Sequence, residues 1–495
     1  MNRMNKSCGF GVVFLLVLTA CEMDEALLLP GRESQTTGEH GYTLVARISH
    51  VTDTHIVDEE SPARFPGAHD LTLSAWRPYE SYSTQLLDGI LRTVNRIHAS
   101  GRTIDFVVHA GDACDNTQSN ELAWCLAVFD GLGVNPLTGP DDRPTEDRPE
   151  PLLDPHAAFT AQGLYRTGIH GNLPSIPWYA VIGNHDRFAI GVFPVFEDFW
   201  GKRTAPFPFP QRPGVLLPAV LDPLALFAHS HVTPADPGPP CLLNIPEFVV
   251  PNPDRAFFNQ REFVRSMFTT QTGPAGHGFN DPEAGPTWYS VSPVPGLRLI
   301  GLDTCDPAHL IEGFPYQEGA ISAEQVAYLR AELAAAQDRD ELVVVVSHHP
   351  SASLWDGYGS ALIGSSFRAL LNEHPNVVAH LAGHNHRNRV MDRDGYLEIE
   401  TCSTLDIPQE GRLVEIWRDD DDDSIMVAYE MFSHLDDELP ALGDDPLRPM
   451  REIAQAIALG DAGASERQKH RDASGASPHG GPSDRNGTTI LRQKR

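Results

Sequence analysis

Residues 342–350 read Leu-Val-Val-Val-Val-Ser-His-His-Pro, a run of β-branched side chains that ends in two histidines. A short, almost purely apolar run of this kind predicts a strand buried on both faces, as strands of parallel sheets are. His348 and His349 follow directly after the predicted strand. Because ligands of layered α/β folds gather outside the carboxyl ends of the strands, histidines at this position indicate a functional site.

Four other predicted strands end in the same way. They cover residues 44–51, 104–110, 176–182 and 377–381, and each is followed within a few residues by Asp, Asn or His. Together with His348, the polar side chains at these strand ends are Asp53, His55, Asp112, Asn184, His185, His384 and His386.

The chemistry of these side chains indicates a pair of metal ions. Two carboxylates, one amide oxygen and four of the imidazoles suit borderline divalent cations such as Mn, Zn, Fe or Co. Two ions about 3.5–4 Å apart can clamp both oxygens of an in-line phosphoryl displacement and lower the pKa of a shared water. Each motif alone is weak evidence, because Gly-Asp is common in turns. All five in order, each after an apolar strand, predict a two-metal phosphoesterase.

The same motifs resemble those of the calcineurin-like metallophosphoesterases, which include purple acid phosphatases and cyclic-nucleotide phosphodiesterases. The pattern D-x-H, G-D, G-N-H-[DE], H and G-H-x-H is complete between residues 53 and 386. The resemblance implies an α/β fold, a four-layer α/β/β/α sandwich of two mixed β-sheets flanked by helices, with long loop insertions. Both metal ions would lie at one end of the sandwich, on loops from both sheets.

The resemblance also implies a role for each residue. Three side chains would hold one metal ion, and these are Asp53, His55 and His386. Three would hold the other, and these are Asn184, His348 and His384. Asp112 would bridge the two ions. His185 would face the substrate and stabilise the transition state or protonate the leaving oxygen, and Asp186 would orient His185 by accepting a hydrogen bond.

Neighbouring polar residues leave some choices open. His348 and His349 point in opposite directions on an extended chain, so only one should reach the site, and the resemblance favours His348. Purple acid phosphatases have a tyrosine three residues after the bridging aspartate, whereas this chain has Asp115, which disfavours the iron–tyrosinate branch. We expect His50 and His109 to be core or supporting histidines.

Two more residues and an acidic run complete the candidates. Asn116 and Arg187 are near enough to the motifs to contact phosphate. The acidic run 419–423 predicts a solvated hairpin tip rather than a calcium site. Cys114 and Cys125 are close enough in sequence for a local disulfide, although five cysteines after Cys21 leave at least one unpaired.

The N-terminus predicts export. Residues 1–21 have a short basic start and an apolar run too short to span a bilayer, which is typical of a signal peptide. The run ends Leu18-Thr19-Ala20-Cys21, which resembles the lipobox of bacterial lipoproteins and implies a lipid anchor on Cys21. The protein would then be held on the membrane of the cell envelope; in the alternative, an ordinary signal peptide, Cys21 is incidental.

The rest of the chain divides by composition. We expect a tether at 22–41 and a catalytic domain at 42–435, interrupted by Pro- and Gly-rich insertions at 131–175 and 188–285. The insertions either wall a substrate cleft or decorate the surface. A C-terminal extension at 436–459 and a disordered tail at 460–495 would follow.

The net charge limits the partners. A formal charge of −30 disfavours nucleic acid, because so negative a surface repels a phosphate backbone. We therefore expect a small phosphodiester or phosphomonoester as substrate. The alternatives are a nuclease of the same fold, which would need a basic stripe, and a non-catalytic metal-binding module, which should have lost ligands. The oligomeric state stays open.

Overall fold

The computed structural model describes the chain in ten longer segments and a few short ones. The longer segments are 35–37, 40–61, 77–138, 154–165, 175–197, 252–306, 317–355, 359–419, 424–461 and 476–491, and the short ones are 203–204, 227–228, 246–247, 421–422 and 464. The predicted signal segment with Cys21 lies outside them. No helix within these segments is long and apolar enough to cross a membrane.

The first sheet joins strands from both ends of the chain. Its order is β21-β20-β19-β2-β3-β6, and β1 pairs with β2 beside this path. β2, β3 and β6 are parallel, and the other pairings are antiparallel. The strands are β1 (Gln35–Thr37), β2 (His40–Val51), β3 (Phe106–His109), β6 (Trp178–Ala180), β19 (Glu410–Asp419), β20 (Ile425–Ser433) and β21 (Gly487–Leu491).

The second sheet is formed by the later half of the chain. Its order is β13-β14-β15-β16-β18-β17, with a parallel centre and an antiparallel strand at each edge. The strands are β13 (Tyr289–Val294), β14 (Leu297–Gly301), β15 (Leu342–Val346), β16 (Val377–Ala382), β17 (Arg389–Asp392) and β18 (Leu397–Glu400).

Strand β15 has a hydrophobic cluster on each face, as its sequence predicts. Leu342, Val344 and Val346 pack between the two sheets, in a cluster that also contains residues of β2 and β3. Val343 and Val345 alternate with them and pack under the helices on the outer face. Burial of each such side chain contributes about 1.5–3 kcal/mol relative to exposure.

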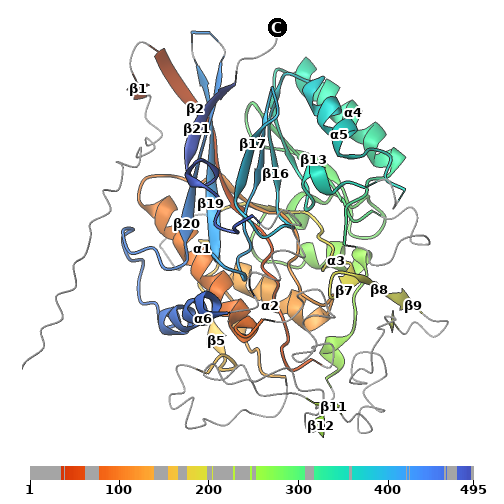
Figure 1. The fold of residues 1–495 in the computed structure, drawn as a ribbon, viewed down its shortest axis with the longest axis vertical. Helices are drawn as coiled ribbons and strands as arrows, with labels where there is room; N and C mark the ends of the chain where they lie inside the picture. The colour runs from red at the N-terminus through yellow and green to blue at the C-terminus, as the bar shows by residue number, and fades with distance from the viewer. Residues whose placement is uncertain are drawn as a thin grey trace, which may run out of the picture.

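Helices cover the outer face of each sheet (Figure 1). α4 (Ala323–Asp338) and α5 (Gly364–Asn372) lie over the second sheet. α1 (Ser83–Ala99) and α2 (Ser119–Asp130) lie on the side of the first sheet, and α6 (Arg448–Gly460) packs against α1. The predicted four-layer α/β/β/α sandwich is confirmed.

The predicted insertions contain short local elements. In 131–175, β4 (Gly133–Val134) pairs with β5 (Phe159–Thr160). In 188–285, the pairs are β7 (Phe188–Ala189) with β8 (Phe193–Pro194), β9 (Phe196–Glu197) with β10 (Arg203–Thr204), and β11 (Phe227–Ala228) with β12 (Pro246–Glu247).

The end of the second insertion belongs to the core rather than to a surface loop. α3 (Gln260–Met267) begins at a capping box in which Asn259 and Glu262 bond each other's backbone N–H. Phe263 and Met267 of this helix pack in the cluster between the layers. The prediction of a loop-like insertion up to residue 285 is therefore wrong from about residue 252 onward.

Both predicted terminal boundaries also need correction. Residues 35–37 and 40–41, expected in a tether, form β1 and the start of β2. The expected disordered tail is wrong for residues 476–491, which contain α8 (Pro482–Arg485) and β21. Here the exposed edge of β20 supplies five backbone partners for a segment that is too short to form a strand alone.

Two smaller predictions have clear outcomes. Cys114 and Cys125 are free, as are Cys305 and Cys402, so the local disulfide is wrong. The acidic run does form a turn between β19 and β20, where the Asp419 carboxylate accepts hydrogen bonds from the backbone N–H groups of Asp421 and Asp422.

Candidate metal centre

The loops after the parallel strands bring one group of ligands together. Asp53 and His55 follow β2, Asp112 follows β3, and His386 lies on the loop after β16. One ligand atom from each lies within 4.8 Å of the others. His386 Nε2 lies 2.9 Å from His55 Nε2 and 3.1 Å from Asp53 Oδ1.

A second group lies next to the first. Asn184 Oδ1 is 2.9 Å from His348 Nε2 and 3.2 Å from His384 Nδ1. Asp112 Oδ2 is 3.2 Å from His348 Nε2 and 3.6 Å from His55 Nε2, so its carboxylate lies between the two groups. All seven predicted ligands therefore converge, and Asp112 has the position that a bridging ligand needs.

The donor set fits cations because several lone pairs face one another. His386 Nδ1 contacts Asp406 Oδ2 at 2.6 Å, and His348 Nδ1 contacts the Ala110 carbonyl oxygen at 2.9 Å. A ring proton on each Nδ1 leaves each Nε2 as an acceptor. These Nε2 atoms face another imidazole nitrogen, carboxylates and an amide oxygen, and such acceptors repel one another unless a cation or a proton lies between them.

The pKa shifts agree with a site built for positive charge. Burial lowers the pKa of His348, but the adjacent Asp112 carboxylate outweighs it and raises the pKa to about 9. Burial and Arg77 likewise lower the pKa of His55, while Asp115, Asp53 and Asp112 raise it to about 9 overall. Burial raises the pKa of Asp112, but the surrounding imidazoles hold it well below its usual range. The carboxylates of the group thus favour positive charge among the imidazoles around them.

The backbone of the ligand loops is strained. Five predicted ligands have left-handed backbone conformations, which cost about 1–3 kcal/mol each for residues other than glycine. Their φ angles are 51° for Asp53, 42° for His55, 56° for Asp112, 69° for His384 and 50° for His386. Strain of this kind persists only where the surroundings fix it, and it is typical of functional sites.

Two glycines let the loops approach closely. A Cβ on Gly183 would lie 2.1 Å from Asp112 Oδ1, and a Cβ on Gly383 would lie 2.1 Å from Thr52 Oγ1 and 2.3 Å from Asp53 Oδ2. Any larger residue would push into a ligand carboxylate or its support, so the Gly of each Gly-Asn-His and Gly-His-Asn-His motif is needed for geometry.

An outer set of side chains supports the ligand imidazoles. Asp115 Oδ1 lies 2.9 Å from His55 Nδ1, and Asp406 Oδ2 contacts His386 Nδ1. Arg77 lies between these carboxylates, with Nη1 3.0 Å from Asp115 Oδ1 and Nε 3.0 Å from both Asp406 oxygens. Sequence reasoning missed Asp406, although it follows β18 as the ligands follow their strands. Arg77 has no such signal.

His185 lies beside the centre and is held through its backbone and its ring. Its N–H donates to Asp112 Oδ1 at 2.8 Å, and its Nδ1 contacts the Asp115 carbonyl oxygen at 2.8 Å. Its ring meets the His55 ring edge-on at a centroid distance of 4.5 Å. Burial lowers the pKa of His185 to about 4, although Asp112 opposes this shift. The ring is thus neutral near pH 7, and no residue that the structure describes bonds its Nε2.

The expectation that Asp186 accepts a hydrogen bond from His185 is wrong. Asp186 Oδ1 accepts from Cys114 N–H at 3.0 Å and Oδ2 accepts from Gly183 N–H at 2.9 Å. The carboxylate thus ties the two ligand loops together by their backbones. Burial, with a smaller contribution from Asp112, raises its pKa to about 7.

His349 and Asn116 have hydrogen-bond partners other than the predicted ligands. Thr304 Oγ1 lies 2.8 Å from His349 Nδ1 and the Gln317 carbonyl oxygen lies 3.2 Å from Nε2, so both nitrogens of His349 have partners outside the centre. His348 is therefore the histidine that reaches Asp112. The side chain and the backbone N–H of Asn116 both donate to Glu121.

Three further polar residues lie near the ligand loops. His50 Nδ1 bonds Thr401 Oγ1 at 2.9 Å, and His109 Nε2 bonds Thr54 Oγ1 at 3.2 Å, as expected of supporting histidines. Burial lowers the pKa of His50 to about 3 and that of His109 to about 4. Arg187 Nη1 is buried without a hydrogen-bond partner among the described residues.

Part of the chain matches a family model and two curated proteins. The family described as "Calcineurin-like phosphoesterase" matches residues 46–235. This range contains six of the nine predicted site residues, from Asp53 to Asp186. A manganese-dependent ADP-ribose/CDP-alcohol diphosphatase of Xenopus laevis is 33% identical over 110 residues, and the one of Xenopus tropicalis is 34% identical over 103 residues. These matches cover 20% and 19% of this chain, and 29% and 28% of those proteins.

A solved structure that aligns with this chain is more distant in sequence. A dimetal phosphatase from Danio rerio aligns over 79% of this chain and 98% of its own, with 14% identity and a TM-score of 0.40. The matched region covers less than a third of the length of the two Xenopus proteins.

Proposed function

We propose that this protein hydrolyses small phosphate esters at a centre that binds two divalent metal ions. The observation that carries the proposal is the convergence of seven ligand side chains in two adjacent groups, with the Asp112 carboxylate between them. The family match over residues 46–235 and the diphosphatase relatives support it.

The substrate that we propose is a small phosphodiester, phosphomonoester or diphosphate ester. The matched relatives are named for ADP-ribose and CDP-alcohols and for dependence on manganese, so Mn²⁺ is the first metal to test. The net charge of −30 favours small substrates over nucleic acid.

Metal ions at this centre would supply a hydroxide near neutral pH and neutralise charge on the phosphoryl oxygens. Asp53, His55 and His386 would hold one ion, and Asn184, His348 and His384 the other. His185 would protonate the leaving oxygen through Nε2 after that nitrogen has taken up a proton from water, because its Nδ1–H is held by the Asp115 carbonyl oxygen.

We also propose that the chain is exported and anchored through a lipid on Cys21, as the lipobox-like sequence suggests. Bacteria that express the full chain should incorporate labelled palmitate into it and retain it in the membrane fraction. The Cys21→Ser variant should lose the label. A wild-type chain that is exported without label would favour an ordinary signal peptide.

The first experiment measures hydrolysis of p-nitrophenyl phosphate, bis-p-nitrophenyl phosphate and ADP-ribose after chelation and again after addition of Mn²⁺. We expect turnover only with metal, and the preferred compound identifies the ester class. Two bound metals without turnover on any of these compounds would overturn the proposed substrate class. Absence of both metal and turnover would favour a non-catalytic module.

Two substitutions separate metal assembly from chemistry. Asp112→Asn should lower the metal content, because it weakens the bridge between the ions. His185→Ala should keep the metal and lower kcat by about 10²–10⁴-fold, the usual contribution of general acid–base catalysis. Metal analysis and steady-state kinetics check both, with His374→Gln on the surface near α5 as a control. Equal metal loss in both variants would contradict the role given to His185.

A further inference from the structure

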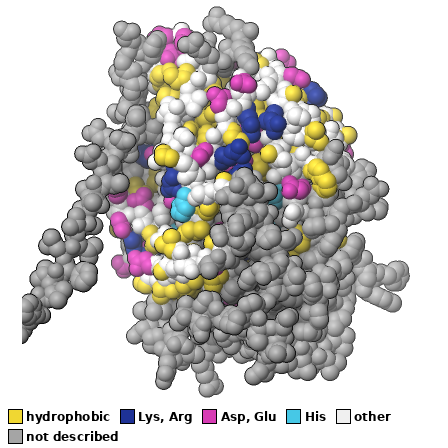
Figure 2. All heavy atoms as spheres, in the orientation of Figure 1, with side chains coloured by type: hydrophobic (Ala, Val, Ile, Leu, Met, Phe, Trp, Pro, Cys, Tyr) yellow, Lys and Arg dark blue, Asp and Glu magenta, His cyan; other side chains and the backbone are white. Residues whose placement is uncertain are grey.

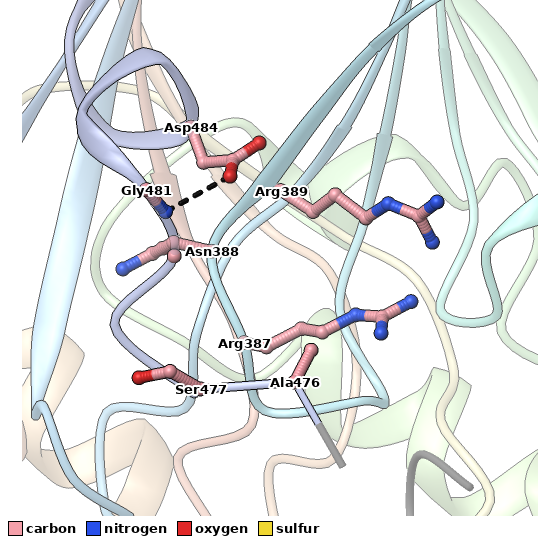
Figure 3. A pocket seen from close by; sticks show the side chains of 8 residues that line it. Arg387, Asn388, Arg389, Ala476, Ser477, Gly481 and Asp484 are labelled. Carbon is pink, nitrogen blue, oxygen red and sulfur yellow. Dashed lines mark hydrogen bonds between the residues drawn. The ribbon is translucent and has the colours of Figure 1, made fainter. Parts of the chain in front are cut away.

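A polar cavity lies beside the loop that carries His384 and His386. Its volume is about 440 Å³, within the range of small-molecule sites. One wall is the segment directly after His386, and the other is the C-terminal segment before β21 (Figure 3). The lining residues are Arg387, Asn388, Arg389, Ala476, Ser477, Gly480, Gly481 and Asp484.

Two arginines project from the first wall in the same direction. Arg387 lies in the bend before β17, and Arg389 is the first residue of that strand. Figure 3 shows the two guanidinium groups side by side, both pointing away from Asp484. Such a pair can present several N–H donors to one oxyanion.

The two arginines differ in their partners. Arg387 is largely buried, and its Nε lies 2.8 Å from Oε2 of the buried Glu400, which fixes its position. Arg389 is exposed, and no hydrogen bond or ion pair joins its guanidinium to any residue that the structure describes. Arg389 therefore has its charge and its donors available for a ligand.

The opposite wall is fixed to the metal loop. Asn388 N–H donates to the Pro478 carbonyl oxygen at 2.9 Å, and Val390 N–H donates to Asp484 Oδ1 at 3.0 Å. Asp484 Oδ2 also accepts from Gly481 N–H at 2.9 Å. Since both oxygens of Asp484 accept backbone hydrogen bonds, its negative charge is already partly compensated.

The charge of this region contrasts with that of the whole chain. Figure 2 shows Arg side chains in the area of the edge strand β17, with Asp and Glu side chains scattered around them. In a chain with a net charge of −30, a local cationic area beside a polar cavity attracts anions to that place.

We propose that Arg387 and Arg389 bind a second phosphate group of the substrate while the phosphate to be cleaved lies at the metal centre. Arg387 directly follows His386, and its partner Glu400 Oε2 also accepts from Asn385 Nδ2, so the cavity adjoins the loop that carries two of the ligands. The assignment rests on the proposed function and narrows it to esters that carry two phosphate groups. Free inorganic phosphate shares the same chemistry and is the other source of such an anion.

Kinetics on the metal-loaded full chain test the subsite. Arg389→Gln should raise KM for ADP-ribose about tenfold, the effect of losing about 1.4 kcal/mol of binding, and should leave KM for p-nitrophenyl phosphate unchanged. Arg389→Lys should recover part of the loss, because it keeps the charge but not the planar fork. Arg330→Gln, an exposed arginine on α4, is the matched control.

Binding of inorganic phosphate after chelation provides a second readout. Calorimetry should show phosphate binding by the wild-type chain that weakens about tenfold in Arg389→Gln but not in Arg330→Gln. An equal KM for ADP-ribose in wild type and Arg389→Gln would overturn the substrate subsite, even if phosphate binding changes. Arg389-dependent phosphate binding without hydrolysis of any ester would overturn the proposed function and leave an anion site.

Discussion

Arg77 connects the two carboxylates that face the ligand histidines His55 and His386. Its guanidinium bonds Asp115 and both oxygens of Asp406, and Tyr79 O–H donates to Asp406 as well. Groups that orient ligand imidazoles commonly affect metal affinity almost as strongly as the ligands do. Because one cation serves both carboxylates, Arg77 couples the orientation of two imidazoles.

We expect Arg77→Met to weaken Mn²⁺ binding by about 10–100-fold, since Asp115 and Asp406 would lose their shared cation. Tyr79→Phe, which removes a single hydrogen bond to Asp406, should have a smaller effect in the same direction. Metal titration by calorimetry gives the affinities, and circular dichroism shows whether each variant is folded. A folded Arg77→Met protein with wild-type Mn²⁺ affinity would contradict the positioning role.

At the scale of secondary-structure elements, the C-terminal segment completes both a sheet and a wall of the cavity. β21 pairs with β20 over five residues, and Tyr429 O–H on β20 donates to the Ser483 carbonyl oxygen at 2.8 Å. The backbone N–H groups of Asn388 and Val390 also donate to acceptors in this segment.

We expect deletion of residues 476–495 to lower the Tm, because each lost hydrogen bond contributes about 0.5–1.5 kcal/mol. Deletion of residues 492–495, which leaves β21 complete, is the control. Scanning calorimetry gives the Tm, and proteolysis reports exposure of the β20 edge. Equal Tm values for the two deletions would show that β21 adds nothing to stability.

The strand ends and the fold could be predicted because their signals are local. The apolar run of β15 and the polar residues after it can be read from nearby positions alone. β21 could not be read in this way, since five residues form a strand only because the edge of β20 is available. Arg77 was missed because its partners Asp115 and Asp406 are distant in sequence. α3 was missed although Asn259 and Glu262 are a readable capping box.

For the whole molecule, buried neutral histidines make stability depend on pH. His434 follows β20, and neither of its ring nitrogens has a hydrogen-bond partner among the described residues. Burial, and then the nearby Arg451 and Arg448, lower its pKa from 6.5 to about 3, while Asp445 opposes this shift. Between pH 6.5 and about 3 the unfolded chain therefore binds more protons than the folded chain, and the free energy of unfolding falls as pH falls.

We expect His434→Leu to lose less stability on acidification, with a slope that is shallower by up to about 1.4 kcal/mol per pH unit. The lowered pKa values of His50 and His109 affect stability in the same direction, so some pH dependence should remain in the variant. The test therefore compares the slope of the variant with that of the wild type. Urea unfolding of chelated protein from pH 7 to pH 4 measures the slopes, with His479→Leu as an exposed control. Parallel slopes for wild type and His434→Leu would contradict the assignment.

The pairing of β2 with β19 has a consequence for the newly made chain. These neighbouring strands are far apart in the sequence, as the paired residues Arg412 and His50 show. The first and last ligands, Asp53 and His386, are also far apart in the sequence. Contacts at such sequence separation form late and slowly, because the intervening chain must be ordered first. A growing polypeptide at the ribosome therefore contains no finished metal centre until His386 has been added. We expect the chain to acquire its metal ions only after its synthesis is nearly complete.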